Sequence, residues 1–146
     1  NVIYDGEVVG YLGEVHPQVA DNYSIKERVY VAVIDMPKVV ALATFDRKYE
    51  GIARFPAVSR DISMVMPKDI LAGEVEKVFD AKGGSYLEHY ELFDIYEGEQ
   101  IKEGFKSMAY SITFRAKDKT LEENDITAVM KKILNGLEGL GIELRQ

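Results

Sequence analysis

Residues 90–116 read YELFDIYEGEQIKEGFKSMAYSITFRA and form the clearest β-hairpin pattern in the chain. The first arm ends at Tyr96 and the second begins at Phe105. Successive residues of a strand point to opposite faces of a sheet, so alternation sorts each arm into two sets of side chains. The hairpin therefore predicts a sheet and also what each of its faces carries.

The two faces predicted for this hairpin differ in size and polarity. The core face of the second arm would carry the bulky set Met108, Tyr110, Ile112 and Phe114. On the first arm we expect Phe93 and Ile95 to face the core. The opposite, open face would then carry Leu92, Asp94 and Tyr96 beside Ser107, Ala109, Ser111, Thr113 and Arg115. An aromatic ring and a carboxylate beside a row of hydroxyls indicate either a solvated face or a binding surface.

Length and composition are those of an ordinary globular protein. The chain has 146 residues and a mass of 16.5 kDa, with 47% hydrophobic and 29% charged residues. This is enough for one core, or for one core and part of another. No apolar run reaches the roughly 18 residues of a membrane helix, and no signal-peptide pattern opens the chain. We therefore expect no membrane partner and a cytoplasmic location.

Several kinds of chemistry are disfavoured by the residues that are missing or scattered. The absence of cysteine excludes disulfides, thiolate catalysis and thiol-ligated zinc. The two histidines, His16 and His89, lie far apart in sequence and are expected to be structural or exposed. No Ser/His/acid or Cys/His set is visible, so we predict no catalytic residue, no metal site and no cofactor-binding residue in this chain.

The charge argues against binding to duplex nucleic acid through phosphates. The net charge is −7, and the part from Arg54 onward carries 13 basic and 17 acidic residues, a net −4. Phosphate binding needs a dense Lys/Arg surface. Any contact with nucleic acid must therefore be local and must involve bases more than phosphates.

The first 53 residues form an incomplete pattern. A hairpin is predicted over residues 2–15, with Asp5-Gly6 as a type I′ turn, followed by a helical turn at 17–22. A buried-type strand over 30–36 and a helix over 38–45 follow. These elements do not enclose a core, and the first residue is Asn1 rather than Met. We expect residues 1–53 to be the trailing α/β part of a larger domain, with the boundary at 46–53.

From Arg54 the pattern of elements is self-contained. A strand is predicted over 61–66, with Ile62, Met64 and Met66 on one face. Asp69 would cap a helix that ends at Gly83-Gly84, with the apolar stripe Leu71, Val75, Val78 and Phe79. After the hairpin, Thr120 and Glu123 would form the capping box of a second helix, with the stripe Ile126, Val129, Met130, Ile133, Leu134 and Leu137. A short strand over 142–145 ends the chain.

The order strand, helix, strand, strand, helix, strand predicts an α+β, ferredoxin-like βαββαβ sandwich over residues 54–146. Right-handed crossovers place both helices on one face of a four-stranded antiparallel sheet, with the first and third strands in the centre. The open face would then carry Asp61, Ser63, Val65, Leu92, Asp94, Tyr96, Ser107 to Arg115 in steps of two, Glu143 and Arg145.

This open face has the groups that single-stranded RNA recognition needs. Tyr96 could stack on a base, Asp94 with Ser107 and Ser63 could bind base edges, and Arg145 supplies a cation. The alternatives are a solvated face, a small-molecule regulatory or subunit-packing domain, and a small hydrolase. The hydrolase would need an anion nest with a positioned Arg and Asn, and the chain offers Arg54 and Arg60 near the first strand but Asn124 and Asn135 only in the second helix region.

Several blocks of this sequence carry a family resemblance. RFPAVSRDISMVMP, ELFDIYEG, GFKSMAYSITFRA, TLEENDI and GIELR occur in order from Arg54 to Gln146. Together they resemble the ferredoxin-fold anticodon-binding domain that ends the β subunit of bacterial phenylalanyl-tRNA synthetase. The earlier blocks GEVVGYLGEVHPQV and YVAVIDM look like the end of the catalytic-like core domain of the same subunit.

The resemblance implies a function and a set of contact residues. The family's anticodon contacts match at Asp94 and Tyr96 in FDIY, at Ser107 in KSMAY and at Arg145 in ELR, with Ser63 as a weaker candidate. It implies phenylalanine tRNA and the synthetase α subunit as partners, the latter in a heterotetramer. It also implies a parent class II ligase that uses ATP and magnesium at an active site on the α subunit. This chain itself is then expected to be non-catalytic.

Overall fold

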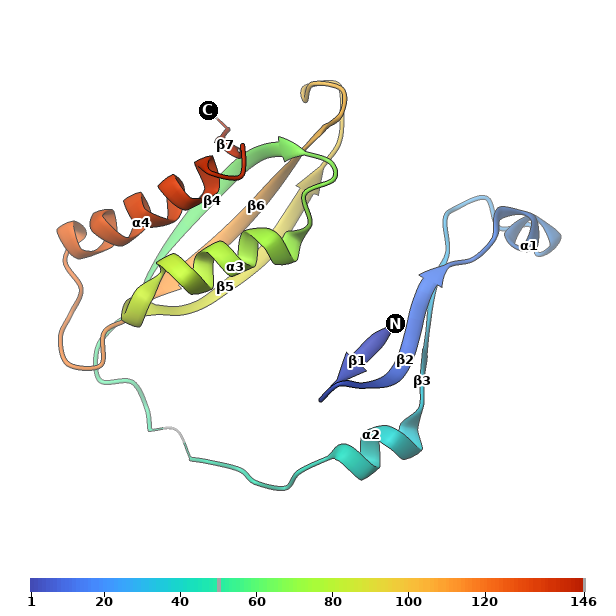
Figure 1. Cartoon of the computed structure of the whole chain (residues 1–146), viewed down its shortest axis with the longest axis horizontal. Coiled ribbons are helices and arrows are strands. Elements are labelled where there is room, and N and C mark those ends of the chain that lie inside the picture. Colours follow the sequence, from blue (N-terminus) through green and yellow to red (C-terminus); the bar gives the residue numbers. More distant parts are fainter. Residues whose placement is uncertain (50, 146) are drawn as a thin grey trace. The chain divides into compact units, whose positions relative to one another are not determined.

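The computed structural model describes residues 1–49 and 51–145 and divides into two compact units, Asn1–Glu50 and Gly51–Gln146. Figure 1 shows both units and the segment that joins them. The second unit contains nearly all of the buried apolar side chains and every residue proposed above for binding.

The first unit is a three-stranded antiparallel sheet with two short helices. Its strands lie side by side in the order β1-β2-β3, and its elements are β1 Val2–Tyr4, β2 Glu7–Glu14, α1 Pro17–Asn22, β3 Tyr30–Ile34 and α2 Met36–Leu42. The predicted I′ turn is confirmed, because Asp5 and Gly6 both have positive φ, of 48° and 78°. The helix predicted over 38–45 begins earlier, at Met36, because Asp35 caps it by accepting a hydrogen bond from Lys38 N.

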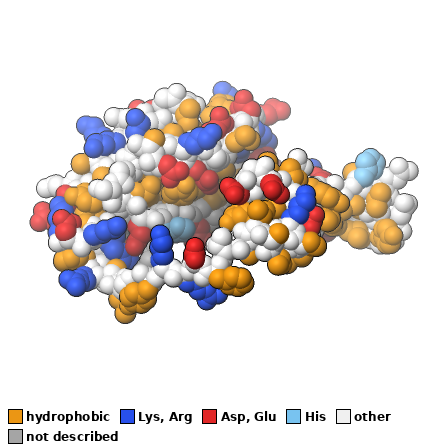
Figure 2. All heavy atoms as spheres, turned by 60° about the horizontal axis from the view of Figure 1, so that its bottom comes forward, with side chains coloured by type: hydrophobic (Ala, Val, Ile, Leu, Met, Phe, Trp, Pro, Cys, Tyr) orange, Lys and Arg blue, Asp and Glu red, His pale blue; other side chains and the backbone are white. Residues whose placement is uncertain are grey.

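One expectation for this unit is wrong. The strand β3 was predicted to be buried, but all five of its residues are exposed. Val9 and Ala20 are the buried apolar side chains among residues 1–49. In Figure 2 many hydrophobic atoms accordingly lie on the visible surface, among interspersed acidic and basic side chains.

The second unit has the predicted βαββαβ order and the predicted strand arrangement. Its elements are β4 Val58–Pro67, α3 Ala72–Lys82, the 3₁₀ turn η1 Gly84–Tyr86, β5 Leu87–Tyr96, β6 Phe105–Phe114, α4 Glu123–Glu138 and β7 Glu143–Leu144. The sheet order is β5-β6-β4-β7 with antiparallel pairing throughout, so β4 and β6 are central. Helices α3 and α4 cover one face of this sheet (Figure 1).

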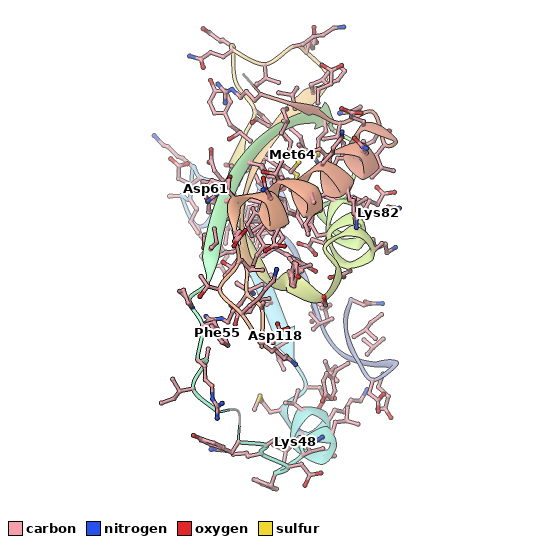
Figure 3. All side chains as sticks on the ribbon, turned by 90° about the vertical axis from the view of Figure 1, so that its left-hand side faces the viewer. Lys48, Phe55, Asp61, Met64, Lys82 and Asp118 are labelled. Atoms are coloured by element: carbon pink, nitrogen blue, oxygen red, sulfur yellow. The ribbon has the colours of Figure 1, made fainter. Side chains whose placement is uncertain are left out.

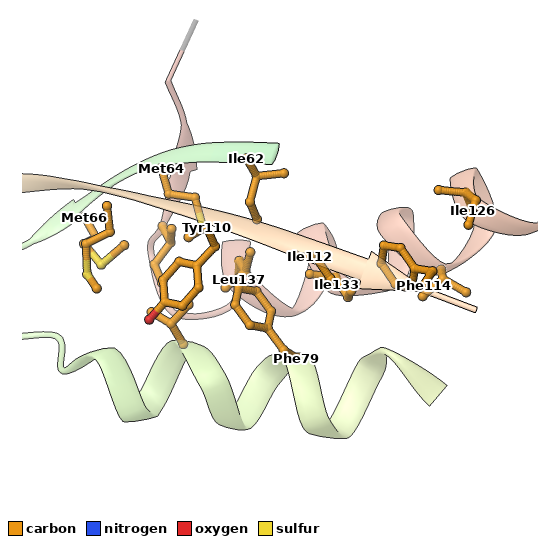
Figure 4. Close-up of a cluster of buried hydrophobic side chains, with 14 of the residues drawn as sticks. Ile62, Met64, Met66, Phe79, Tyr110, Ile112, Phe114, Ile126, Ile133 and Leu137 are labelled. Atoms are coloured by element: carbon orange, nitrogen blue, oxygen red, sulfur yellow. The ribbon is translucent and has the colours of Figure 1, made fainter. Parts of the chain in front are cut away.

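The core lies between that face and the two helices (Figure 4). The predicted core set of β6 is confirmed, because Met108, Tyr110, Ile112 and Phe114 are almost fully buried. From β4 and the helices come Ile62, Met64, Met66, Val75, Phe79, Ile126, Val129, Ile133 and Leu137. Tyr110 and Phe79 meet edge to face with ring centroids 5.1 Å apart, and the Tyr110 hydroxyl donates to Glu76. Burial of the Tyr110 ring, together with the nearby Glu76 carboxylate, raises the pKa of its hydroxyl.

The starts of both helices differ from the prediction. Helix α3 begins after Leu71 and is not capped by Asp69, because the Glu74 carboxylate accepts a hydrogen bond from Leu71 N. Leu71 itself is 66% exposed and does not belong to the buried stripe. The second begins after Glu122 rather than at a Thr120/Glu123 box. There the Asp125 carboxylate accepts from Glu122 N at 3.1 Å and from Lys119 Nζ at 2.7 Å. In both helices an acidic residue three positions beyond the cap satisfies the first free N–H group.

Candidate nucleic-acid interface

The open face of the second unit is the sheet face turned away from α3 and α4. Asp61 lies on this side of β4, whereas Met64 points between the sheet and the helices (Figure 3). The strand register aligns residues of the open face into rows that cross all four strands. Tyr96 pairs with Ser107, Ser107 with Val65, and Val65 with Glu143.

A second row lies beside the first and contains the remaining predicted residues. Asp94 pairs with Ala109 and Ala109 with Ser63, and the Arg145 N–H donates to the Ser63 carbonyl at 2.8 Å. Neighbouring rows on one face are two residues apart, or about 7 Å. The register thus brings Ser63, Asp94, Tyr96, Ser107 and Arg145 together in two adjacent rows. Ser107 in the first row and Ala109 in the second lie on the central strand β6, and their small side chains form the floor of this surface.

The predicted alternation on β5 is wrong over its middle part, because the strand contains a β-bulge. The register shifts between Leu92, which pairs with Tyr110, and Asp94, which pairs with Ala109. Leu92 therefore packs against the core and does not belong to the open face. Phe93, the extra residue at the bulge, is 56% exposed instead of buried. Ile95 lies on the helix side, opposite Met108, but is 54% exposed, so it is not a core residue either.

The bulge restores the alternation at the end of the strand, so that Asp94 and Tyr96 reach the open face. Without it, the core side chains Tyr90 and Leu92 would share a face with both of them. Within residues 1–49 and 51–145, no side chain hydrogen-bonds or pairs with the exposed Asp94 carboxylate. That carboxylate therefore keeps its capacity to accept hydrogen bonds from a ligand.

Tyr96 and Arg145 form a direct contact. The Arg145 guanidinium carbon lies 5.7 Å from the centre of the Tyr96 ring, within the range of a cation–π interaction. Tyr96 is on the edge strand β5 and Arg145 follows the opposite edge strand β7, so their contact spans the two central strands. Ser107 lies between these edges and is only 4% exposed. The serine predicted for direct binding is therefore covered, whereas Tyr96 keeps 36% of its surface exposed.

The loop between β5 and β6 supplies residues that the sequence pattern did not single out. Gln100 accepts a hydrogen bond from Arg145 Nη2 at 3.0 Å. Glu97 pairs with Lys68 at 2.8 Å, and this hydrogen-bonded cation lowers the pKa of the Glu97 carboxyl. Strand alternation cannot predict such contacts, because the loop has no repeating pattern.

Other features weigh against the alternative functions. Arg60 belongs to the helix side of β4 and pairs with Glu123 at the start of α4, so it is not part of an anion nest. Asn124 and Asn135 lie within α4. A small pocket of about 170 Å³ at the β7 edge is lined by the apolar side chains of Met64, Leu134, Leu137, Ile142 and Leu144, with Glu138 and Glu143 beside them. No phosphate-binding group lines that pocket.

Among the described residues, no group of three or more His, Cys, Asp or Glu side chains could hold a metal ion. His16 is exposed and its Nδ1 accepts from Gln18 N, and His89 is exposed on β5. In the same part of the chain, none of the helices has the length and apolar character needed to cross a membrane.

Comparison with protein families gives two matches. Residues 53–145 match the ferredoxin-fold anticodon binding domain, and residues 1–36 match the phenylalanyl tRNA synthetase beta chain CLM domain. The two matches follow one another along the chain without overlap. The anticodon-binding match, over residues 53–145, covers every helix and strand of the second unit.

Similar curated proteins are phenylalanine–tRNA ligase beta subunits. The subunit of Clostridium acetobutylicum is 45% identical over 139 residues, which is 94% of this chain and 18% of that protein. The subunit of Lactiplantibacillus plantarum is 38% identical over 145 residues, covering 98% of this chain and 18% of the relative. That of Bacillus subtilis is 36% identical over 138 residues, covering 94% and 17%. The chain thus spans less than a fifth of the length of these relatives.

Proposed function

Since this chain belongs to the ferredoxin-fold anticodon binding domain family, we propose that the open face of its second unit binds the unpaired anticodon bases of a tRNA. The substrate we propose is phenylalanine tRNA, whose anticodon is GAA, because the similar proteins are phenylalanine–tRNA ligase beta subunits. The contact residues in this proposal are Asp94, Tyr96, Ser107, Arg145 and Ser63.

The observation that carries the proposal is the pair of adjacent rows on the open face. They combine an aromatic ring, a free carboxylate, a hydroxyl and a guanidinium around a floor of small residues. Unstacked bases bind to aromatic rings by stacking and to polar side chains through their edges. A carboxylate accepts hydrogen bonds from the amino and imino groups of bases but repels phosphate. Asp94 would therefore contact a base edge and not the RNA backbone. Ser107 is nearly buried, so its contact with a base would be limited to the small part of its surface that is exposed.

The charge distribution fits a role limited to base recognition. The part from Arg54 onward carries a net −4, and its open face includes Asp61, Asp94 and Glu143. Such a surface gains little from counterion release, the main source of affinity for the nucleic-acid backbone. We propose that other parts of the intact ligase hold the tRNA, while this domain recognises the anticodon.

For the intact protein we propose an ATP- and magnesium-dependent phenylalanine–tRNA ligase in the cytoplasm. The α subunit would be its catalytic partner, and this chain would contribute no catalytic residue. Residues 1–53 would belong to the catalytic-like core domain of the β subunit, a role supported by the family match over residues 1–36. The exposed apolar strand β3 is consistent with a larger domain around it.

Chemical-shift mapping tests the proposed binding face directly. The labelled 146-residue chain is titrated with an RNA hairpin that carries the anticodon GAA, and with the same hairpin carrying a different anticodon. We expect the GAA hairpin to shift the resonances of Ser63, Asp94 and Tyr96. The resonances of residues on the solvent-facing side of α4, such as Lys131 and Lys132, should not shift. Shifts confined to α3 and α4 would contradict the proposal.

A small-molecule or subunit-packing function is the second candidate. It would place the ligand in the mostly apolar pocket at the β7 edge, which residues of α4, β4 and β7 line and which does not include Tyr96. The family match does not favour this function.

A further inference from the structure

The loop between β5 and β6 touches both members of the Tyr96–Arg145 pair. Gly98 lies against the tip of the Tyr96 ring: a Cβ built on Gly98 would lie 2.2 Å from the Tyr96 hydroxyl oxygen and 2.4 Å from Cζ. Gln100, two residues further along, accepts the hydrogen bond from Arg145 Nη2. One short loop therefore fixes the ring at its hydroxyl end and the guanidinium at one nitrogen.

Glycine is needed at position 98 because of the ring and not because of the backbone. Gly98 does not have the positive φ that favours glycine, unlike Gly104 in the same loop. Any other residue could adopt the Gly98 backbone conformation, but its Cβ would collide with the Tyr96 ring. Because the clash includes Cζ as well as the hydroxyl oxygen, rotation of the hydroxyl alone would not relieve it, and the ring itself would have to move.

Gln100 has a matching role for Arg145. The arginine follows the two-residue strand β7, and it is exposed. The hydrogen bond to Gln100 and the contact with Tyr96 together hold the guanidinium on the ring. Fixing a binding group in advance reduces the conformational entropy that binding would otherwise cost.

We propose that Gly98 and Gln100 are positioning residues that hold Tyr96 and Arg145 as a preassembled stacking platform. The guanidinium supports one side of the ring, and the exposed part of the ring receives an unpaired base. This role rests on the proposed function, but the preassembly itself concerns the free protein. Gly98 and Gln100 do not contact the base in this proposal; they act through Tyr96 and Arg145.

Three variants of the 146-residue chain test this proposal. Gly98→Ala introduces the clash, Gln100→Met removes the acceptor at nearly the same side-chain length, and Gln100→Glu restores an acceptor as the conservative variant. Gly51→Ala is the matched control, because a Cβ at Gly51 meets nothing within 4 Å and its φ is not positive. The first readout is the NMR signals of the Tyr96 ring and of Arg145 Nε–H in the free protein. The second is the affinity for the GAA hairpin.

We expect Gly98→Ala and Gln100→Met to shift both sets of signals in the free protein, and Gln100→Glu and Gly51→Ala to leave them close to wild type. Gly98→Ala should weaken RNA binding about tenfold, the loss expected for one stacked base, and Gln100→Met about threefold. Unchanged signals in Gly98→Ala and Gln100→Met would overturn the proposal whatever the RNA does. Tighter RNA binding by Gln100→Met would also overturn it, because the pair would then block the ring. If the signals moved but wild type bound neither hairpin, the proposed function would be at fault, and the stacking role would fall with it.

Discussion

Tyr96 is the single residue on which the proposed affinity depends most. Base stacking on an aromatic side chain contributes about 1–3 kcal/mol. In the intact ligase, Tyr96→Ala should therefore lower the charging efficiency kcat/KM for phenylalanine tRNA by about tenfold at subsaturating tRNA. The loss should be mainly in KM for tRNA, because the proposed active site lies on another subunit. Steady-state charging kinetics would check this split, and an unchanged KM with a reduced kcat would contradict it.

Strand alternation predicts Asp94 and Tyr96 on the open face, but it does not predict the bulge in β5. Plain alternation assigned Leu92 to the same face, and the structure assigns it to the core. A bulge depends on how two strands pair, and neither arm of the hairpin shows the extra residue by itself. The Tyr96–Arg145 contact was likewise unpredictable, because it joins opposite edges of the sheet and depends on the conformation of a loop.

Among the secondary-structure elements, α4 has a start that should respond to pH. The hydrogen bond from Lys119, with a second from Glu122 N, lowers the pKa of the Asp125 carboxyl below its ordinary value of 3.8. A lowered folded-state pKa stabilises the fold above the unfolded pKa, and this contribution is lost as the pH falls through the lower, folded value. Asp125→Asn should therefore lower Tm at neutral pH. The difference in Tm from wild type should shrink below about pH 4, and thermal unfolding at several pH values would show it. A Tm difference that persisted to pH 2 would contradict this assignment.

Strand β6 supplies the clearest test of the core. Ile112 is fully buried among the side chains of the sheet and helices, so Ile112→Ala removes packing that cannot be regained. We expect it to lower the free energy of unfolding by about 2–5 kcal/mol. Tyr96→Ala, on the exposed end of β5, should leave stability nearly unchanged. Chemical denaturation of both variants would compare them, and equal losses would show that Tyr96 is also a structural residue.

The elements themselves were more predictable than their ends. Apolar periodicity identified α3, α4 and the core set of β6, because burial of one face imposes that period on the sequence. The predicted cap residues of α3 and α4 differ from the observed ones, because several acidic and hydroxyl residues lie near each helix start, among them Asp69, Thr120 and Glu122. Which of them caps the helix depends on how the preceding loop packs.

For the chain taken in full, the two units should differ in resistance to proteolysis. The second unit encloses a core, whereas residues 1–49 bury only Val9 and Ala20 among their apolar side chains. Phe45, Tyr49 and Ile52, in the segment that joins the units, are almost fully exposed. Limited proteolysis followed by mass spectrometry should give a resistant fragment that starts near residue 50. A single resistant species that retains Asn1 would show that the units do not behave independently.

The most direct test of anticodon recognition by the open face compares two tRNAs on two enzymes. Wild-type ligase and its Asp94→Ala variant are assayed for kcat/KM with phenylalanine tRNA and with the same tRNA carrying one changed anticodon base. Glu91→Ala serves as the control, because Glu91 is an exposed carboxylate on β5 that pairs with Ser111, one row beyond the two rows that carry the proposed contacts. A base-specific contact is worth about 1–3 kcal/mol, so loss of Asp94 should reduce the preference for the correct anticodon by about tenfold, whereas Glu91→Ala should preserve it. An unchanged preference in the Asp94→Ala enzyme would contradict recognition by this face.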